Sequence, residues 1–161
     1  MESVLVKVGM ADLQVAQSPD RLRTTGLGSC VGVALYDPIA KIGGMAHVML
    51  PNQALSRGDT NRAKYADTAI PLLIDKMEKM GAEPRRMVAK LAGGAQMFKF
   101  QSAHNLSIGR RNVEACHQQL RQANIPVVAE DTGGNFGRTI ELDTVTGILY
   151  VRSVNAGSKK L

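Results

Sequence analysis

The first third of the chain shows short apolar runs and apolar–polar alternation, the patterns that are typical of β-strands. We expect strands at residues 4–8, 11–15, 21–24, 31–36 and 41–50. The dipeptide Asp37-Pro38 is a turn signal, so the last two strands are predicted to form a hairpin with a short loop around residues 38–41. The polar segment 51–62 that follows is expected to be a surface loop.

Helical and strand patterns alternate in the remainder of the chain. An apolar stripe with helical spacing predicts a helix over about residues 61–80, either kinked at Pro71 or starting near Thr68, and Gly81 is a natural stop. A second stripe predicts a helix from about residue 107 to residue 124. Further strands are expected at residues 87–91, 125–129, 139–142 and 148–152, and residues 156–161 are expected to be a frayed tail.

These elements predict a single α/β domain over residues 1–161, with packed mixed β-sheets flanked by two main helices. The length of 161 residues suits one domain, and 44% hydrophobic with 21% charged residues is a globular composition. Glu2, Lys7 and Asp12 interrupt any apolar signal region, and no apolar run approaches the ~18 residues that a membrane span needs. We therefore expect a cytoplasmic protein without membrane insertion, whose two cysteines stay reduced.

The predicted hairpin brings a thiol near an imidazole. If its loop comprises residues 38–41, Cys30 lies opposite Met49. His47 is then the diagonal neighbour of Cys30 on the same face, because side chains alternate along a strand. A two-residue loop would place the two directly opposite one another, whereas an odd loop length or a bulge would separate them.

A thiol beside an imidazole can open an amide through a covalent intermediate. The imidazole activates the thiol and later protonates the leaving group, provided that a third group orients the ring. The residues alone also leave open that Cys30 is an unreactive residue of the core, and that His47 is a core residue whose hydrogen bonds are satisfied.

The turn that leads into Cys30 supplies candidates for the remaining roles. Thr24, Thr25 and Ser29 are the nearby hydroxyls that could orient His47. The glycines of this turn let a substrate approach, and we expect the backbone N–H groups of Gly28 and Ser29 to hold a substrate oxyanion.

Five segments of the chain resemble motifs of the CheD family of chemoreceptor glutamine deamidases. They are residues 24–38, 41–51, 90–98, 108–112 and 131–138, and they follow one another in the family's order over nearly the whole chain. The resemblance implies hydrolysis of selected glutamine side chains to glutamate in methyl-accepting chemotaxis receptors, through a cysteine thioester.

The family's catalytic residues fall on Cys30, His47 and Thr24 of this sequence. Thr25 stands where many members have an apolar residue, so the sequence leaves open which of the two threonines orients His47. The resemblance also implies a fold like that of toxin deamidase catalytic domains and no cofactor. The partners it implies are the cytoplasmic helices of the receptors and a CheC-type phosphatase.

Other classes of function receive less support from the residues. A regulatory binding module without chemistry could use the formal net charge of +6, or a docking edge formed by Phe98 and Phe100. Glycine-rich turns could cradle a phosphate, but none matches a nucleotide-binding fingerprint. Nucleic-acid binding lacks a basic stripe with interleaved aromatics, and His47, His104 and His117 show no metal-ligand spacing with the cysteines.

Overall fold

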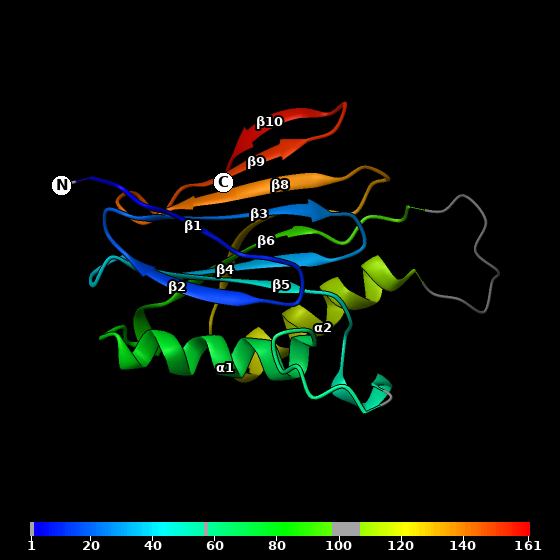
Figure 1. The fold of residues 1–161 in the computed structure, drawn as a ribbon, viewed down its shortest axis with the longest axis horizontal. Coiled ribbons are helices and arrows are strands. Elements are labelled where there is room, and N and C mark those ends of the chain that lie inside the picture. The colour runs from blue at the N-terminus through cyan, green and yellow to red at the C-terminus, as the bar shows by residue number, and fades with distance from the viewer. Residues whose placement is uncertain (1, 57, 98–106) are drawn as a thin grey trace.

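Two β-sheets are stacked face to face, and two helices cover the outer side of one of them (Figure 1). The computed structural model describes residues 2–56, 58–97 and 107–161. Within these residues the predicted α/β class, with mixed sheets and two main helices, is confirmed.

Each sheet combines antiparallel strands with one parallel pair. Sheet A, which lies away from the helices, has the order β1 (Leu5–Lys7), β3 (Arg21–Leu27), β8 (Arg138–Asp143), β9 (Leu149–Ser153) and β10 (Gly157–Lys160). Sheet B has the order β2 (Leu13–Gln17), β5 (Ile42–Val48), β4 (Val31–Asp37), β6 (Val88–Gly93) and β7 (Val127–Thr132). The parallel pairs are β1–β3 and β6–β7.

The helices α1 (Ala66–Lys79) and α2 (Ile108–Gln122) pack on sheet B. Helix α1 begins between the two predicted starts, runs through Pro71 and ends at Lys79, so that Gly81 follows its C-terminal cap as the predicted stop. There the N–H of Gly81 bonds Glu78 and the N–H of Ala82 bonds Met77, which is the Schellman pattern. Two short 3-10 helices, η1 (Gln53–Leu55) and η2 (Pro84–Arg86), were not predicted.

Sheet B is buried on both faces because it lies between two apolar cores. One core fills the space between sheet B and the helices, and the other lies between the two sheets. Every residue of β4 and of β5 is buried, so these strands read as nearly continuous apolar runs. A polar side chain on their inter-sheet face is therefore held in a closed, apolar environment.

The expectation of a frayed tail at residues 156–161 was wrong. Residues 157–160 form the edge strand β10, which pairs antiparallel with β9. Asn155 and Gly157 adopt the left-handed backbone (φ of 62° and 81°) that lets the chain reverse tightly. The strand is then held by two backbone hydrogen bonds between Leu161 and Leu149 and by the ion pair of Lys159 with Asp131.

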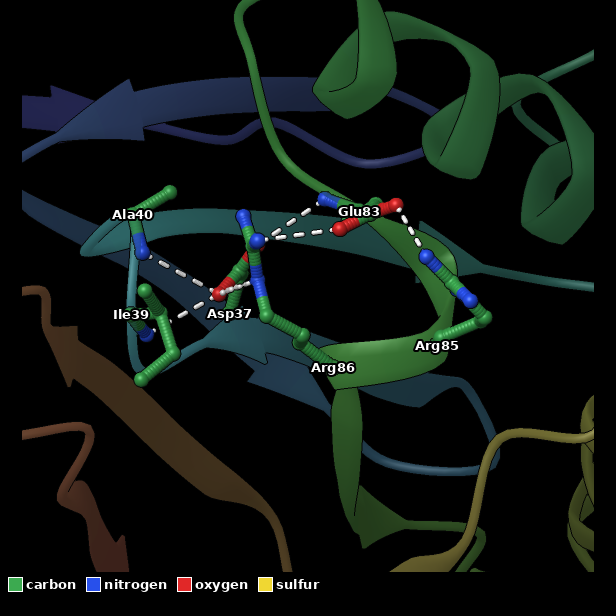
Figure 2. A network of polar contacts seen from close by, with 6 residues as sticks. All are labelled: Asp37, Ile39, Ala40, Glu83, Arg85 and Arg86. Carbon is green, nitrogen blue, oxygen red and sulfur yellow. Dashed lines mark hydrogen bonds and ion pairs between the residues drawn. The ribbon is translucent and has the colours of Figure 1, made fainter.

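The β4–β5 hairpin has the predicted loop, because Asp37 pairs with Ile42. Figure 2 shows the hydrogen-bond donors that surround the buried carboxylate of Asp37 at this turn. It accepts the backbone N–H groups of Ile39 (3.0 Å), Ala40 (3.1 Å) and Glu83 (2.9 Å), and the Arg86 guanidinium (2.9 Å). Burial would raise the pKa of Asp37, but these bonds outweigh it and lower the pKa to about 2.

Candidate active site

Cys30 and His47 are brought to the same face of sheet B by the register of the hairpin. Gly32 of β4 pairs with His47 of β5, and the same register extended by one residue beyond β4 places Cys30 opposite Met49. Cys30 belongs to the core between the sheets, and His47 reaches a residue of sheet A. The side chains therefore occupy the diagonal positions expected for a loop of residues 38–41.

Gly32 lets sheet A come close to this point. A Cβ atom at Gly32 would lie 2.5 Å from Cδ1 of Ile140 in β8, a separation that real contacts do not allow. The absence of a side chain at Gly32 therefore permits the close stacking through which β3 contacts His47.

Thr24 of β3 holds the imidazole ring. Its Oγ1 lies 2.7 Å from the carbonyl oxygen of Val8 and 2.7 Å from Nδ1 of His47, and both side chains are buried. A threonine hydroxyl has one proton, and the Val8 carbonyl can only accept a hydrogen bond. Thr24 therefore donates to Val8 and accepts from the Nδ1–H of His47.

This arrangement selects one tautomer of His47, with the proton on Nδ1 and a lone pair on Nε2. Nε2 is buried and has no hydrogen-bond partner among the described residues. Thr25 is exposed, because successive residues of β3 point to opposite sides. Thr24 is thus the threonine in contact with His47.

The turn that precedes β4 is held by its carbonyl groups. The carbonyl of Gly28 accepts from the N–H of Ala95, and that of Cys30 accepts from the N–H of Gly94, each at 2.9 Å. The Ser29 carbonyl between them accepts Nδ2 of Asn112, also at 2.9 Å. Three consecutive carbonyls are therefore bonded to groups from the end of β6 and from α2.

The N–H groups of the same turn are used differently. The N–H of Gly28 donates to the carbonyl of Gly26 at 3.1 Å. The N–H groups of Ser29 and Cys30 make no hydrogen bond to another described residue. They are the donors of this turn that remain for a substrate.

Burial favours the neutral form of both Cys30 and His47. Burial raises the pKa of the Cys30 thiol, and a hydrogen bond from its own backbone N–H opposes this in part. Burial lowers the pKa of His47. A thiol and a neutral imidazole with a lone pair are the resting forms that these shifts favour.

Gly93 packs closely against the Cys30 turn, and Arg138 holds the neighbouring glycine-rich loop. A Cβ atom at Gly93, where φ is +111°, would lie 2.3 Å from the Cys30 carbonyl oxygen. The buried Arg138 donates to the carbonyl of Gly133 at 2.9 Å and to the carboxylate of Asp131 at 3.2 Å. Arg138 therefore anchors the glycine-rich loop of residues 131–138.

Asn112 is the site residue that sequence reasoning missed. It is fully buried, and its Nδ2 donates to the carbonyls of Ser29 and Met49. The available signal was a short polar side chain within the buried stripe of α2 that also contains Gly109, Cys116 and Leu120.

Cys116 and His117 lie away from Cys30. Cys116 is in the core beside the helices, where burial raises the pKa of its thiol to about 12. His117 bonds Glu130 at 2.8 Å on the surface side of α2. Phe98, Phe100 and His104 lie outside the described residues.

No group of three or more His, Cys, Asp or Glu side chains could hold a metal ion in residues 2–56, 58–97 and 107–161. None of the described helices is long and apolar enough to cross a membrane.

A hollow of about 640 Å³ lies on the outer face of sheet A. Its lining includes Arg23, Thr25, Tyr150, Arg152 and Lys160. Cys30 and His47 are on the opposite side of this sheet, between the two sheets, and do not line it.

Comparison with known proteins shows strong similarity to one family. The model of the family described as CheD chemotactic sensory transduction matches residues 49–153. The chemoreceptor glutamine deamidase CheD of Halalkalibacterium halodurans is 54% identical over 159 residues, which cover 98% of each chain. That of Bacillus velezensis is 52% identical over 158 residues, 97% of this chain and 95% of the relative.

A third relative and one solved structure are also similar to this chain. The probable chemoreceptor glutamine deamidase CheD of Caldanaerobacter subterraneus is 51% identical over 160 residues, 99% of each chain. The crystal structure of the Bacillus licheniformis hypothetical protein YfiH has a TM-score of 0.49 and 16% identity, and the match covers 75% of this chain and 50% of that one.

Proposed function

Because the chain belongs to the CheD family, we propose that it is an enzyme that hydrolyses glutamine side-chain amides of chemoreceptors to glutamate and ammonia. The observation that carries this proposal is the hydrogen bond between Thr24 and His47. It leaves a lone pair on His47 Nε2, on the face of sheet B from which Cys30 projects. A nucleophile, a base of fixed tautomer and a residue that orients the base are the parts that acyl transfer needs.

In the first step the sulfur of Cys30 attacks the carboxamide carbon of a glutamine side chain. His47 Nε2 takes the thiol proton as the bond forms, since both groups are neutral at rest. The carbonyl oxygen becomes an oxyanion, which the backbone N–H groups of Ser29 and Cys30 stabilise. Few donors are available here, because the N–H of Gly28 is already bonded to the carbonyl of Gly26.

The tetrahedral intermediate then collapses. The C–N bond breaks, the imidazolium of His47 gives its proton to the departing ammonia, and a thioester on Cys30 remains. In the second half, His47 takes a proton from water, and the resulting hydroxide attacks the thioester carbon. The C–S bond then breaks, the imidazolium of His47 returns its proton to the sulfur of Cys30, and the released carboxylic acid ionises to glutamate in solution. Thr24 keeps the Nδ1 proton in place through both halves, so the same nitrogen serves as base and acid.

Mass spectrometry of a purified receptor cytoplasmic domain tests the reaction. Glutamine-containing receptor peptides should gain the mass difference between glutamate and glutamine after incubation with this protein. Cys30→Ala should abolish the gain. Cys116→Ala, which removes the other thiol from a fully buried position, should retain it. No conversion by the wild-type protein would refute the proposal, and conversion by Cys30→Ala would refute the thioester.

We further propose that the protein acts in the cytoplasm, on the cytoplasmic helices of receptors, and that it binds a CheC-type phosphatase. The likeness to the family supports both partners, and the net charge of +6 suits acidic partner surfaces. Fluorescence anisotropy of the labelled protein titrated with each purified partner tests binding. A signal that does not change with either partner at micromolar concentrations would contradict this part of the proposal.

A further inference from the structure

We propose that Asn112 of α2 is a positioning residue, which sets the direction of the Cys30 N–H group and ties the Cys30 turn to the strand that carries His47. This inference rests on the proposed function for the step that it assists, but its contacts can be tested without any receptor.

The side-chain amide of Asn112 bridges the two chain segments of the site, the turn before Cys30 and the end of the strand that carries His47. Its Nδ2 donates to the carbonyl of Ser29 (2.9 Å), the residue before Cys30, and to the carbonyl of Met49 (3.0 Å), two residues after His47. Both acceptors lie at the end of the β4–β5 hairpin that is opposite its loop. Asp37 therefore fixes the hairpin at one end, and Asn112 joins its two strands at the other.

The bond to Ser29 determines where the next N–H points. A trans peptide is planar, so the C=O of Ser29 and the N–H of Cys30 point in opposite directions. Holding the carbonyl on the α2 side turns the N–H of Cys30 toward its own sulfur. The hydrogen bond from that N–H is what opposes the rise in the pKa of the thiol. The same N–H is one of the two donors that we assign to the oxyanion.

The position of the amide is itself rigid. Asn112 is fully buried, and three residues earlier α2 packs its backbone on the loop after β6. A Cβ atom at Gly109 would lie 2.4 Å from the carbonyl oxygen of Ala95, so only glycine allows this contact. The loop that α2 contacts here also supplies the N–H groups that bond the carbonyls of Gly28 and Cys30.

An amide at this place carries a structural cost that a leucine would avoid. Oδ1 of Asn112 is buried without a hydrogen-bond partner in the part of the chain that the structure describes. An unsatisfied buried acceptor is unfavourable, whereas Cys116 and Leu120 on the same stripe are apolar. The two donor bonds to the hairpin give the reason for a polar side chain here.

The test compares Asn112→Leu, which keeps the branching at Cγ and has no donor, with Leu120→Ala, which removes packing from the same helix without touching the turn. The first readout is the rate of Cys30 alkylation by iodoacetamide as a function of pH, measured in a Cys116→Ala background. We expect Asn112→Leu to move the midpoint of this profile to higher pH and Leu120→Ala to leave it in place. Asn112→Ala serves the same comparison if the leucine variant does not fold.

The second readout is turnover on the receptor domain. We expect Asn112→Leu to lower kcat by about 10- to 100-fold with little change in KM, less than the 10²–10³-fold lost when an oxyanion donor is removed. A folded variant with the wild-type alkylation profile and wild-type kcat would overturn the proposal, as would an equal shift in Leu120→Ala. If the wild-type protein does not deamidate the receptor, the proposed function fails, while the alkylation profiles still decide the role of Asn112.

Discussion

Replacing Asp37 by asparagine should destabilise the protein by an amount that depends on pH in a defined way. Asp37 is buried and its pKa is lowered from 3.8 to about 2 by Arg86 and by three backbone N–H groups. The difference between a pKa of 3.8 and one of about 2 corresponds to about 2 kcal/mol of stability. In a domain of this size that loss lowers Tm by roughly 4–8 °C.

The sign of the pH dependence follows from the direction of the shift. A carboxylate whose folded pKa lies below its unfolded pKa stabilises the fold at pH above the unfolded value of about 3.9. This contribution is lost as the pH falls through the folded value of about 2. The wild-type protein should therefore exceed Asp37→Asn in stability at pH 7, and the two should converge between pH 4 and pH 2.

Urea denaturation followed by circular dichroism at several pH values measures this difference. Asp75→Asn is a matched control, since Asp75 is exposed and forms an ion pair with Lys79 one helical turn away. Its effect should stay within about 0.5 kcal/mol. Equal stability of wild type and Asp37→Asn at pH 7, or a gap that persists undiminished at pH 2, would refute the assignment of the stabilisation to the charge of Asp37.

Three further predictions concern the site and the edge of the fold. Thr24→Val should lower kcat by about 10- to 100-fold, since the imidazole ring of His47 loses the acceptor that orients it, whereas Thr24→Ser should retain most of the activity. Equal rates for the valine and serine variants would show that the hydroxyl is not needed. Alkylation of Cys30 should have a midpoint above the ~8.5 of an ordinary thiol, because burial raises the pKa of Cys30, and a midpoint near neutrality would contradict a neutral resting pair. Deleting residues 157–161 should destabilise the fold by about 1–3 kcal/mol in urea melts, since it removes strand β10, whereas a frayed segment would leave stability unchanged.

The local part of the site could be predicted because it lies within one hairpin. His47 comes 17 positions after Cys30, and the turn at Asp37 is enough to set their register. The choice between Thr24 and Thr25 depends on how sheet A stacks on sheet B. Alternation along β3 places Thr24 on the same face of the strand as the buried Leu22. Only the contact between the two sheets shows that this face of β3 lies against His47.

The contribution of Asn112 could not be read from spacing. It comes from a helix 83 residues after Ser29 along the chain, and the contact exists only because α2 packs its first turns on the loop after β6. The edge strand β10 was missed for a related reason. Its residues are exposed and polar, so they show no hydrophobic pattern, and pairing with β9 supplies the order that the sequence pattern lacks.

In the mechanism that we propose, the electrostatics of the site explain why proton transfer has to accompany attack. Burial disfavours the ionised forms of Cys30 and His47 alike, so a thiolate–imidazolium pair would need support that the resting site lacks. During attack the negative charge moves from sulfur to the substrate oxygen, where the N–H groups of Ser29 and Cys30 can bond it. The imidazolium is stabilised at the same time, because Thr24 still accepts its Nδ1–H. The charges therefore form only where donors and acceptors are already in place, which favours the transition state over the resting enzyme.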